Sequence, residues 1–152
     1  MSSEAGNLSF RWLGRISYAD GLELQDQLVA QRQEREISDQ VLLLEHDPVY
    51  TIGRTRDQSS LLDAEARGLN VVETNRGGQA SYHGPGQLVG CPILDLTHYG
   101  KDLHVYHRAQ EECLIAACAD FGIEAGRRDG LTGVWVENRK LASIGVGVKR
   151  WV

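Results

Sequence analysis

The chain has 152 residues, a length that suits one domain with a sizeable hydrophobic core. Hydrophobic residues make up 41% and charged residues 24%, the balance of an ordinary globular protein, and the net charge of −5 disfavours a general nucleic-acid-binding protein. No apolar run approaches the length of a membrane span and no basic-then-apolar leader opens the chain, so we expect a cytoplasmic protein with a single domain, residues 1–152.

The first predicted elements are a strand, a helix and a second strand. Residues 8–16 are mostly apolar with charges interposed, which favours a strand. The segment from about residue 18 to residue 35 is rich in Leu, Gln, Glu and Ala and predicts a helix. Ser17 and Asp20 resemble a capping box at the start of this helix. Residues 41–45 are apolar and bounded by polar residues, which indicates a strand.

A turn and several shorter elements follow. Asp47-Pro48 predicts a turn, and we expect the chain after it to be extended as far as Gly53. Residues 61–67 predict a short helix that ends before a glycine. Strands are expected at 71–74 and 88–96, on either side of a glycine-rich loop.

The remainder of the chain predicts a long helix and a hairpin. Asp102 can cap a helix that ends at Gly122. The apolar residues of this helix fall on one face at steps of three and four: Leu103, Tyr106, Leu114, Ala117, Cys118 and Phe121. Residues 133–136 and 140–148 are expected to pair through a turn at 137–139. Because strands and helices mix without strict alternation, we expect an α+β (mixed α/β) domain with a mostly antiparallel sheet.

The most informative segment is RGGQASYHGPGQLVGCPILDL, residues 76–96. Its glycines let backbone N–H groups approach a ligand closely, because no Cβ stands in the way. Arg76, Tyr82 and His83 could orient that ligand. The alternative is a tight connection between strands with no ligand, but an Arg, a Tyr and a His in one loop exceed what a turn requires. The spacing matches neither the P-loop nor the GxGxxG pattern, so phosphate binding is not the obvious interpretation.

Lys140 begins a strand of small residues, KLASIGVGV. If its ammonium points inward, it can depress the pKa of a neighbouring thiol. The alternative is a solvated lysine in a hairpin. Ser143-Ile144-Gly145 follows on the same strand, where small residues either leave room for a ligand chain or pack closely against a neighbouring strand.

The cysteines and most histidines predict no further site. Cys91, Cys113 and Cys118 form no CxxC pair, which argues against a disulfide framework and a structural zinc site, and we expect all three to be buried, inert thiols. His104 and His107 are three residues apart on the predicted helix, but no third ligand has a persuasive spacing to them. We therefore expect neither a metal nor a cofactor.

Three segments together resemble the lipoyl(octanoyl) transferase family, the octanoyl-acyl-carrier-protein:protein N-octanoyltransferases. They are EHDPVYTIGR at 45–54, the glycine-rich block at 76–96 and GVWVENRKLASIGVGVKRWV at 133–152. They occur in the order of the family and span nearly the whole chain. The resemblance implies the fold of the biotin and lipoate protein ligase catalytic domain, a mostly antiparallel sheet flanked by helices.

The resemblance also implies an activity, the transfer of an octanoyl (or lipoyl) group from acyl carrier protein to a lysine of lipoyl domains through a cysteine thioester. This is the first step of protein lipoylation. By the same resemblance, Lys140 lowers the pKa of the nucleophilic cysteine. The implied substrate-binding residues are Arg76, Gly77, Gly78, Gln79, Ala80, Ser81, Tyr82, His83, Ser143, Ile144 and Gly145. We expect the two segments that carry them to enclose the acyl carbonyl.

One departure from the family concerns the nucleophile. The acyl-accepting cysteine of the family lies in a Pro-Cys-Gly context after the KRW segment, and none of the three cysteines present matches that position. We therefore expect the nucleophile downstream of Val152, and a chain truncated at its C-terminus that lacks it as given.

The implied partners are octanoyl-acyl carrier protein as donor, and lipoyl domains of 2-oxoacid dehydrogenase E2 subunits and glycine cleavage H protein as acceptors. Neither nucleic acid nor a membrane is expected. Because such donors and acceptors are acidic, the enzyme would need a local basic rim, for which the candidates are Arg76, Arg127, Arg128, Lys149 and Arg150. The alternatives are an ATP-dependent lipoate or biotin protein ligase and a non-catalytic acyl-binding module.

Overall fold

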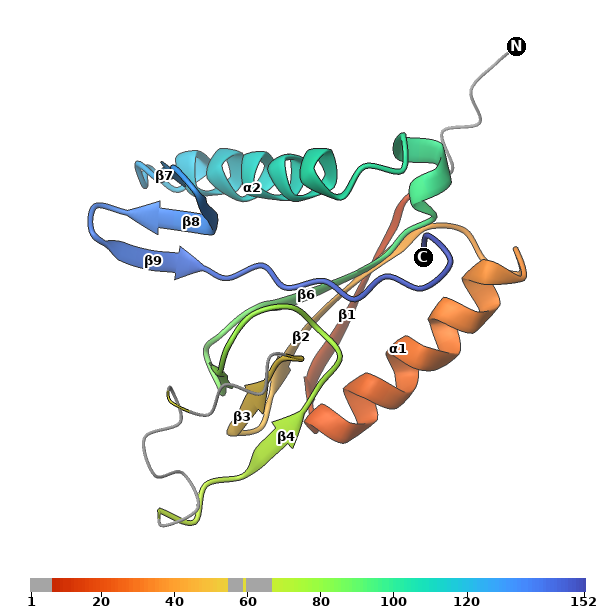
Figure 1. Cartoon of the computed structure of the whole chain (residues 1–152), viewed down its shortest axis with the longest axis horizontal. Helices are drawn as coiled ribbons and strands as arrows, with labels where there is room; N and C mark the ends of the chain where they lie inside the picture. The colour runs from red at the N-terminus through yellow and green to blue at the C-terminus, as the bar shows by residue number, and fades with distance from the viewer. Residues whose placement is uncertain (1–6, 55–58, 60–66) are drawn as a thin grey trace. The chain divides into compact units, whose positions relative to one another are not determined.

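The structure, a computed structural model, describes residues 7–54, 59 and 67–152 (Figure 1). Its contacts divide the chain into two compact units. Unit 1 holds the chain up to His98 together with Gly147–Val152, and unit 2 is Tyr99–Val146. The predicted short helix at 61–67 lies outside the described residues, apart from its last position.

Unit 1 opens with strand β1 (Ser9–Ile16) and helix α1 (Tyr18–Gln33), as predicted. The Ser17 side chain caps α1, because its hydroxyl oxygen accepts the backbone N–H of Asp20 at 3.1 Å and its O–H donates to the Asp20 carboxylate at 2.7 Å. A serine at this position satisfies an N–H that has no partner inside the helix. The predicted helix start at Ser17 is confirmed, with Ser17 and Asp20 joined as the capping-box pattern suggests through their side chains.

The core of unit 1 lies between α1 and a three-stranded sheet in the order β1-β2-β6. The central strand, β2 (Gln40–His46), pairs parallel with β1 and antiparallel with β6 (Val89–Ile93). Alternate residues of β2 are buried, as expected when successive side chains point to opposite faces. The core cluster consists of Leu28, Leu42, Leu44 and Ile93.

A second sheet of unit 1 has the order β4-β3-β5. β3 (Val49–Ile52) pairs parallel with β4 (Val71–Glu73) and antiparallel with β5 (Ser81–His83). The predicted glycine-rich loop therefore contains a short strand, which sequence patterning missed because only three residues separate glycine-rich turns. The predicted strand at 88–96 is shorter than expected and only partly buried, since Leu88 is 65% exposed.

Unit 2 contains α2 (Leu103–Asp120) and an antiparallel sheet in the order β7-β8-β9. The strands are β7 (Gly126–Arg128), β8 (Leu131–Val136) and β9 (Arg139–Ala142). Asp102 caps α2, as predicted, by accepting the backbone N–H groups of His104 and Val105. The predicted hairpin is present, but its second strand ends at Ala142, six residues earlier than expected.

The predicted apolar face of α2 is not a buried face in this structure. Among the described residues of α2, Glu111 is the buried one, whereas Phe121, at the C-cap, is 83% exposed. The expectation of buried thiols is wrong for Cys113, which is exposed, while Cys91 and Cys118 are half-buried. Helical spacing places residues on a shared face, but only tertiary contacts decide whether that face is covered.

The pairings confirm a largely antiparallel α+β arrangement, since among the strands of the described residues only β1 with β2 and β3 with β4 run parallel. In the described chain the strands form three small sheets rather than the one sheet that was expected. A short 3-10 helix, η2 (Leu96–Tyr99), follows β6. Over the described residues, neither helix combines the length and the apolar character that crossing a membrane requires.

Candidate functional site

The glycine loop (residues 76–87) is held against the end of β3. Arg54 donates its backbone N–H to the carbonyl oxygen of Arg76 at 3.1 Å. A Cβ added at Gly53 would clash with the carbonyl oxygen of Gly78, so only glycine lets the two backbones approach this closely. The N-terminal part of the loop is therefore positioned by a specific backbone contact.

The Arg76 side chain folds back onto β3. Its Nη2 donates to the Thr51 hydroxyl at 2.7 Å and to the Thr51 carbonyl at 3.1 Å, and its Nη1 donates to the Gly77 carbonyl at 2.9 Å. Burial lowers the pKa of the Arg76 guanidinium, and the nearby Tyr18 opposes that shift. Within the described chain the hydrogen bonds of Arg76 all go to uncharged oxygens, so its positive charge favours a negatively charged or strongly polarised ligand group.

The C-terminal part of the glycine loop is held by its own side chains and by β2. Gln87 donates its Nε2–H to the Tyr82 carbonyl at 2.9 Å, and Gln87 Oε1 lies 2.7 Å from Nδ1 of His83. Gly86 donates its backbone N–H to the Glu45 carboxylate at 2.9 Å. Together these contacts fix the orientation of the imidazole of His83.

Two further rings pack against His83. The Tyr18 ring, from the first turn of α1, stacks on it at 5.8 Å between centroids, and the His46 ring, from the end of β2, meets it edge-on at 5.7 Å. His46 is 1% exposed, and its Nδ1 lies 3.2 Å from the carbonyl oxygen of Ile16. Gly21 leaves room for this ring, because a Cβ there would lie 2.8 Å from Cε1 of His46.

The electrostatics of this cluster keep the rings of His83 and Tyr18 uncharged. Burial lowers the pKa of His83; the hydrogen bond with Gln87 opposes that shift, and the charges of His46 and Arg76 add to it. Burial also raises the pKa of Tyr18, against the effect of Arg76. His83 is therefore a neutral imidazole near pH 7, able to accept a proton.

Cys91 lies near this cluster, but its thiol is not activated as a nucleophile. Burial raises the pKa of its thiol to about 11, so almost none of it is thiolate at neutral pH. Its side chain packs against the core of unit 1. The interpretation of Cys91 as a core thiol fits this environment.

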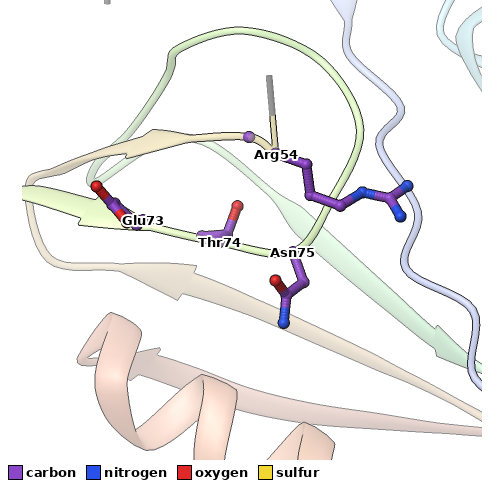
Figure 2. Close-up of a pocket in the computed structure, with 5 residues that line it drawn as sticks. Arg54, Glu73, Thr74 and Asn75 are labelled. Carbon is purple, nitrogen blue, oxygen red and sulfur yellow. The ribbon is translucent and has the colours of Figure 1, made fainter. Parts of the chain in front are cut away.

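A cavity of about 270 Å³ opens beside the glycine loop and is lined by Gly53, Arg54, Glu73, Thr74 and Asn75. Figure 2 shows that Arg54 comes from the end of β3 and the other labelled side chains from β4 and the segment after it. The lining side chains are polar, so this cavity does not suit an apolar acyl chain.

Lys140 lies in unit 2, where its side chain crosses β8. Its Nζ lies 5.1 Å from the centre of the Trp135 ring, a cation–π distance. A Cβ at Gly133 would lie 2.6 Å from Cε of Lys140 and also 2.6 Å from the backbone carbonyl oxygen of Ala142. The φ of Gly133 is +135°, so the backbone contact and the backbone conformation both require glycine there. Lys140 is exposed, which agrees with the alternative interpretation of a solvated lysine within unit 2.

The backbone under Lys140 is anchored by a buried carboxylate. Glu111, 1% exposed on α2, accepts the backbone N–H of Gly133 at 3.0 Å and pairs with Arg108 at 2.7 Å and Arg127 at 2.9 Å. Burial alone would raise the pKa of Glu111, but these donors outweigh it and the pKa lies below its ordinary value. Ser143, Ile144 and Gly145 follow β9 without regular structure.

The predicted site residues thus fall in two groups. Residues 76–83 lie together in unit 1, the first three in the loop after β4, Gln79 and Ala80 leading into β5, and Ser81, Tyr82 and His83 within it. Lys140 and residues 143–145 lie in unit 2. Sequence reasoning missed the part that Tyr18, His46 and Gln87 play around His83. The position of His46 at the start of the HDPVYTIGR run was the available signal.

Comparison with known families and proteins gives a consistent result. Residues 17–152 match the family described as the lipoyl protein ligase A/B catalytic domain. The chain is 51% identical to an octanoyltransferase of Solibacter usitatus and 50% identical to one of Geobacter metallireducens, over 96% and 95% of its own length. It spans 68% and 67% of the lengths of these relatives.

Solved structures agree on the fold. The chain is similar to LipL1 of P. falciparum in complex with lipoate, with a TM-score of 0.69, 18% identity and coverage of 95% of this chain and 45% of that one. It is also similar to a lipoate-protein ligase A bound with ATP, with a TM-score of 0.58, 17% identity and coverage of 89% and 58%. The predicted fold, that of the lipoate ligase catalytic domain, is confirmed.

Proposed function

The chain belongs to the lipoyl protein ligase A/B catalytic-domain family, and from that premise we propose that it transfers an octanoyl or lipoyl group to a lysine of a lipoyl domain. The observation that carries the proposal is an identity of about half over nearly the whole chain to proteins called octanoyltransferases. Sequence identity of about 50% over this length favours a shared reaction more strongly than a shared fold does, because one fold supports several reactions.

The proposed donor is octanoyl-acyl carrier protein, and the acyl group passes through a cysteine thioester. A thiolate attacks the donor thioester, the bond from the carbonyl carbon to the donor sulfur breaks, and the carrier thiol leaves. The cysteine that carries the acyl group is expected downstream of Val152, because none of the three present fits the role. Cys91 in particular is disfavoured by its raised pKa.

Each predicted segment has a part in this proposal. Residues 76–83 line the acyl site, where loop N–H groups stabilise the oxyanion that forms at the carbonyl. Residues 143–145 line the path of the acyl chain, whose burial contributes about 0.8 kcal/mol per methylene. Lys140 favours the thiolate by placing a positive charge near it.

The proposed acceptors are lipoyl domains of 2-oxoacid dehydrogenase E2 subunits and of the glycine cleavage H protein. They and the acyl carrier protein are acidic, so basic residues on an enzyme of net charge −5 would guide the encounter. Arg127 and Arg128 are already engaged, with Glu111 and Glu112 and with Asn138 respectively. Lys149 and Arg150 are further candidates for the basic rim.

The test uses full-length protein, which supplies any residues encoded after Val152. Mixed with octanoyl-acyl carrier protein and no ATP, it should gain the mass of one octanoyl group, and the adduct should pass to the lysine of an added lipoyl domain. Mass spectrometry of both proteins measures the two steps. Acylation that requires ATP and free octanoate would instead identify a ligase. Binding without any covalent adduct would identify an acyl-binding module.

A further inference from the structure

The hydrogen bonds of Gln87 determine which nitrogen of His83 carries the proton. Gln87 Nε2 lies 2.9 Å from the Tyr82 carbonyl oxygen, and Gln87 Oε1 lies 2.7 Å from His83 Nδ1. A carbonyl oxygen can only accept, so the amide nitrogen must face Tyr82 and the amide oxygen must face His83. Nδ1 therefore carries the proton, and Nε2 keeps a lone pair.

The lone pair on Nε2 of His83 has no donor among the residues that the structure describes. The ring cannot turn freely, because Tyr18 stacks on it and His46 meets it edge-on. His46 is itself fixed, since its Nδ1–H can only donate to the carbonyl oxygen of Ile16.

The charges that face His83 favour the neutral ring. They come from Arg76 in the glycine loop and, if it becomes protonated, from His46 on β2, while Tyr18 on α1 stays uncharged. The nearby carboxylate of Glu45 is engaged by the N–H of Gly86. A neutral imidazole with a free Nε2 lone pair is the form that a general base requires.

On the proposed function, the second half-reaction needs such a base. We propose that His83 accepts the proton of the attacking lysine amine through Nε2, and that Gln87 is the positioning residue that holds His83 in this tautomer. The lysine arrives as an ammonium and gives one proton to Nε2, and the neutral amine nitrogen then forms a bond to the thioester carbonyl carbon. The carbon–sulfur bond breaks, the electron pair leaves with the sulfur as thiolate, and the nitrogen releases its second proton to solvent. The imidazolium formed at His83 returns its proton to solvent.

The tautomer of His83 can be measured by NMR spectroscopy without an assay of enzymatic activity. In ¹⁵N-labelled full-length protein, long-range ¹H–¹⁵N spectra of the imidazoles, with His83 assigned from the His83→Gln variant, should show a protonated Nδ1 and an unprotonated Nε2 at pH 7.5. In Gln87→Met this preference should be lost. A wild-type ring protonated on Nε2 would overturn the proposal, whatever the enzyme does.

The kinetic test isolates the octanoyl-enzyme and then adds the lipoyl domain. Transfer should be slower by about 100-fold in His83→Gln and by roughly tenfold in Gln87→Met. Both acyl-enzymes should react with hydroxylamine at the wild-type rate, because that amine is neutral at pH 7 and needs no base. Gln27→Met, an exposed glutamine on α1, is the matched control and should transfer normally.

Gln87→Glu separates positioning from a merely structural role. Its carboxylate still accepts from Nδ1 and should raise the imidazole pKa, so transfer should persist with the acidic limb of its pH–rate profile moved to higher pH. An unchanged profile in Gln87→Glu, or a wild-type transfer rate in His83→Gln, would overturn the proposal. If wild-type enzyme forms no acyl adduct, the proposed function fails instead, while the tautomer remains readable.

Discussion

Gly53 shows how a single residue can hold the candidate site in shape. Its Cα faces the carbonyl oxygen of Gly78 so closely that a side chain cannot fit. Gly90, on β6, offers a contrast, because a Cβ there would lie an ordinary 3.8 Å from its nearest neighbour, Cδ2 of Leu43. Two glycines in one unit therefore meet very different steric constraints.

Gly53→Ala should consequently displace the start of the glycine loop. We expect a loss of about 1–3 kcal/mol in the free energy of unfolding, the usual cost of overpacking, together with weaker acyl-enzyme formation. Urea denaturation and the adduct assay measure the two effects. Gly90→Ala should leave stability unchanged or slightly raise it, since alanine is less flexible than glycine in the unfolded chain. Equal stability of the two variants would contradict the steric argument.

Lys140 is the second residue whose proposed role can be separated from its surroundings. If its ammonium stabilises the thiolate, Lys140→Ala should raise the pKa of the nucleophilic cysteine. A shift of one unit corresponds to about 1.4 kcal/mol, or roughly a tenfold slower acyl-enzyme formation at a pH below both values. The measurement is the rate of octanoyl-enzyme formation in full-length protein between pH 6 and pH 10.

Arg139→Ala is the matched control for Lys140→Ala. Arg139 is the adjacent cation on β9 and is also exposed, but it pairs across the hairpin with Val136, whereas Lys140 pairs with Trp135. Removing it should change the rate little. A rate in Lys140→Ala that matches wild type across the whole pH range would show that the thiolate does not depend on this amine.

At the scale of elements, Glu111 joins α2 to β8. A single buried carboxylate accepts the Gly133 N–H and pairs with Arg108 and Arg127. Because Lys140 crosses Gly133, the same carboxylate sets the backbone on which that lysine rests. Helix and hairpin therefore depend on one ionised side chain that the hydrophobic pattern of α2 did not reveal.

Glu111→Gln should destabilise unit 2. The amide can still accept from Gly133 but loses its charge, so we expect a loss of about 2 kcal/mol, the usual contribution of a hydrogen bond to a charged group. Glu112→Gln, an exposed partner of Arg127, should cost well under 1 kcal/mol. Urea denaturation monitored by the fluorescence of Trp135, with Trp12 and Trp151 replaced by phenylalanine in all variants, measures both.

The same network predicts a dependence of stability on pH. The folded pKa of Glu111 lies below its ordinary value of 4.5, so the unfolded chain binds this proton first as the pH falls. The contribution of the ionised Glu111 carboxylate to the free energy of unfolding is complete above pH 4.5 and is lost as the pH drops through the folded pKa. Wild type should therefore lose more stability than Glu111→Gln between pH 5 and pH 3. If the free energies of unfolding of wild type and Glu111→Gln changed with pH in parallel, the predicted role of Glu111 would be contradicted.

At the scale of the whole molecule, local sequence patterns predicted where the helices and strands lie better than they predicted which of their residues are buried. The strand at 9–16, the helix that Ser17 caps and the helix that Asp102 caps all lie where the sequence placed them. These features depend on neighbours within a few residues, because a cap satisfies N–H groups two or three positions away. The exposure of Cys113 and the early end of β9 depend on distant partners, and sequence patterning missed both.

The candidate site divides in the same way. The sequence by itself determined the family blocks, the glycine-dense segment and the choice of His83 and Lys140, because these are matters of residue type and spacing. Only the tertiary structure decided that Tyr18, His46 and Gln87 surround His83, since they come from α1, from β2 and from the far end of the loop. The protonation of an imidazole depends on the atoms its nitrogens face, and in this chain folding alone brings those atoms together.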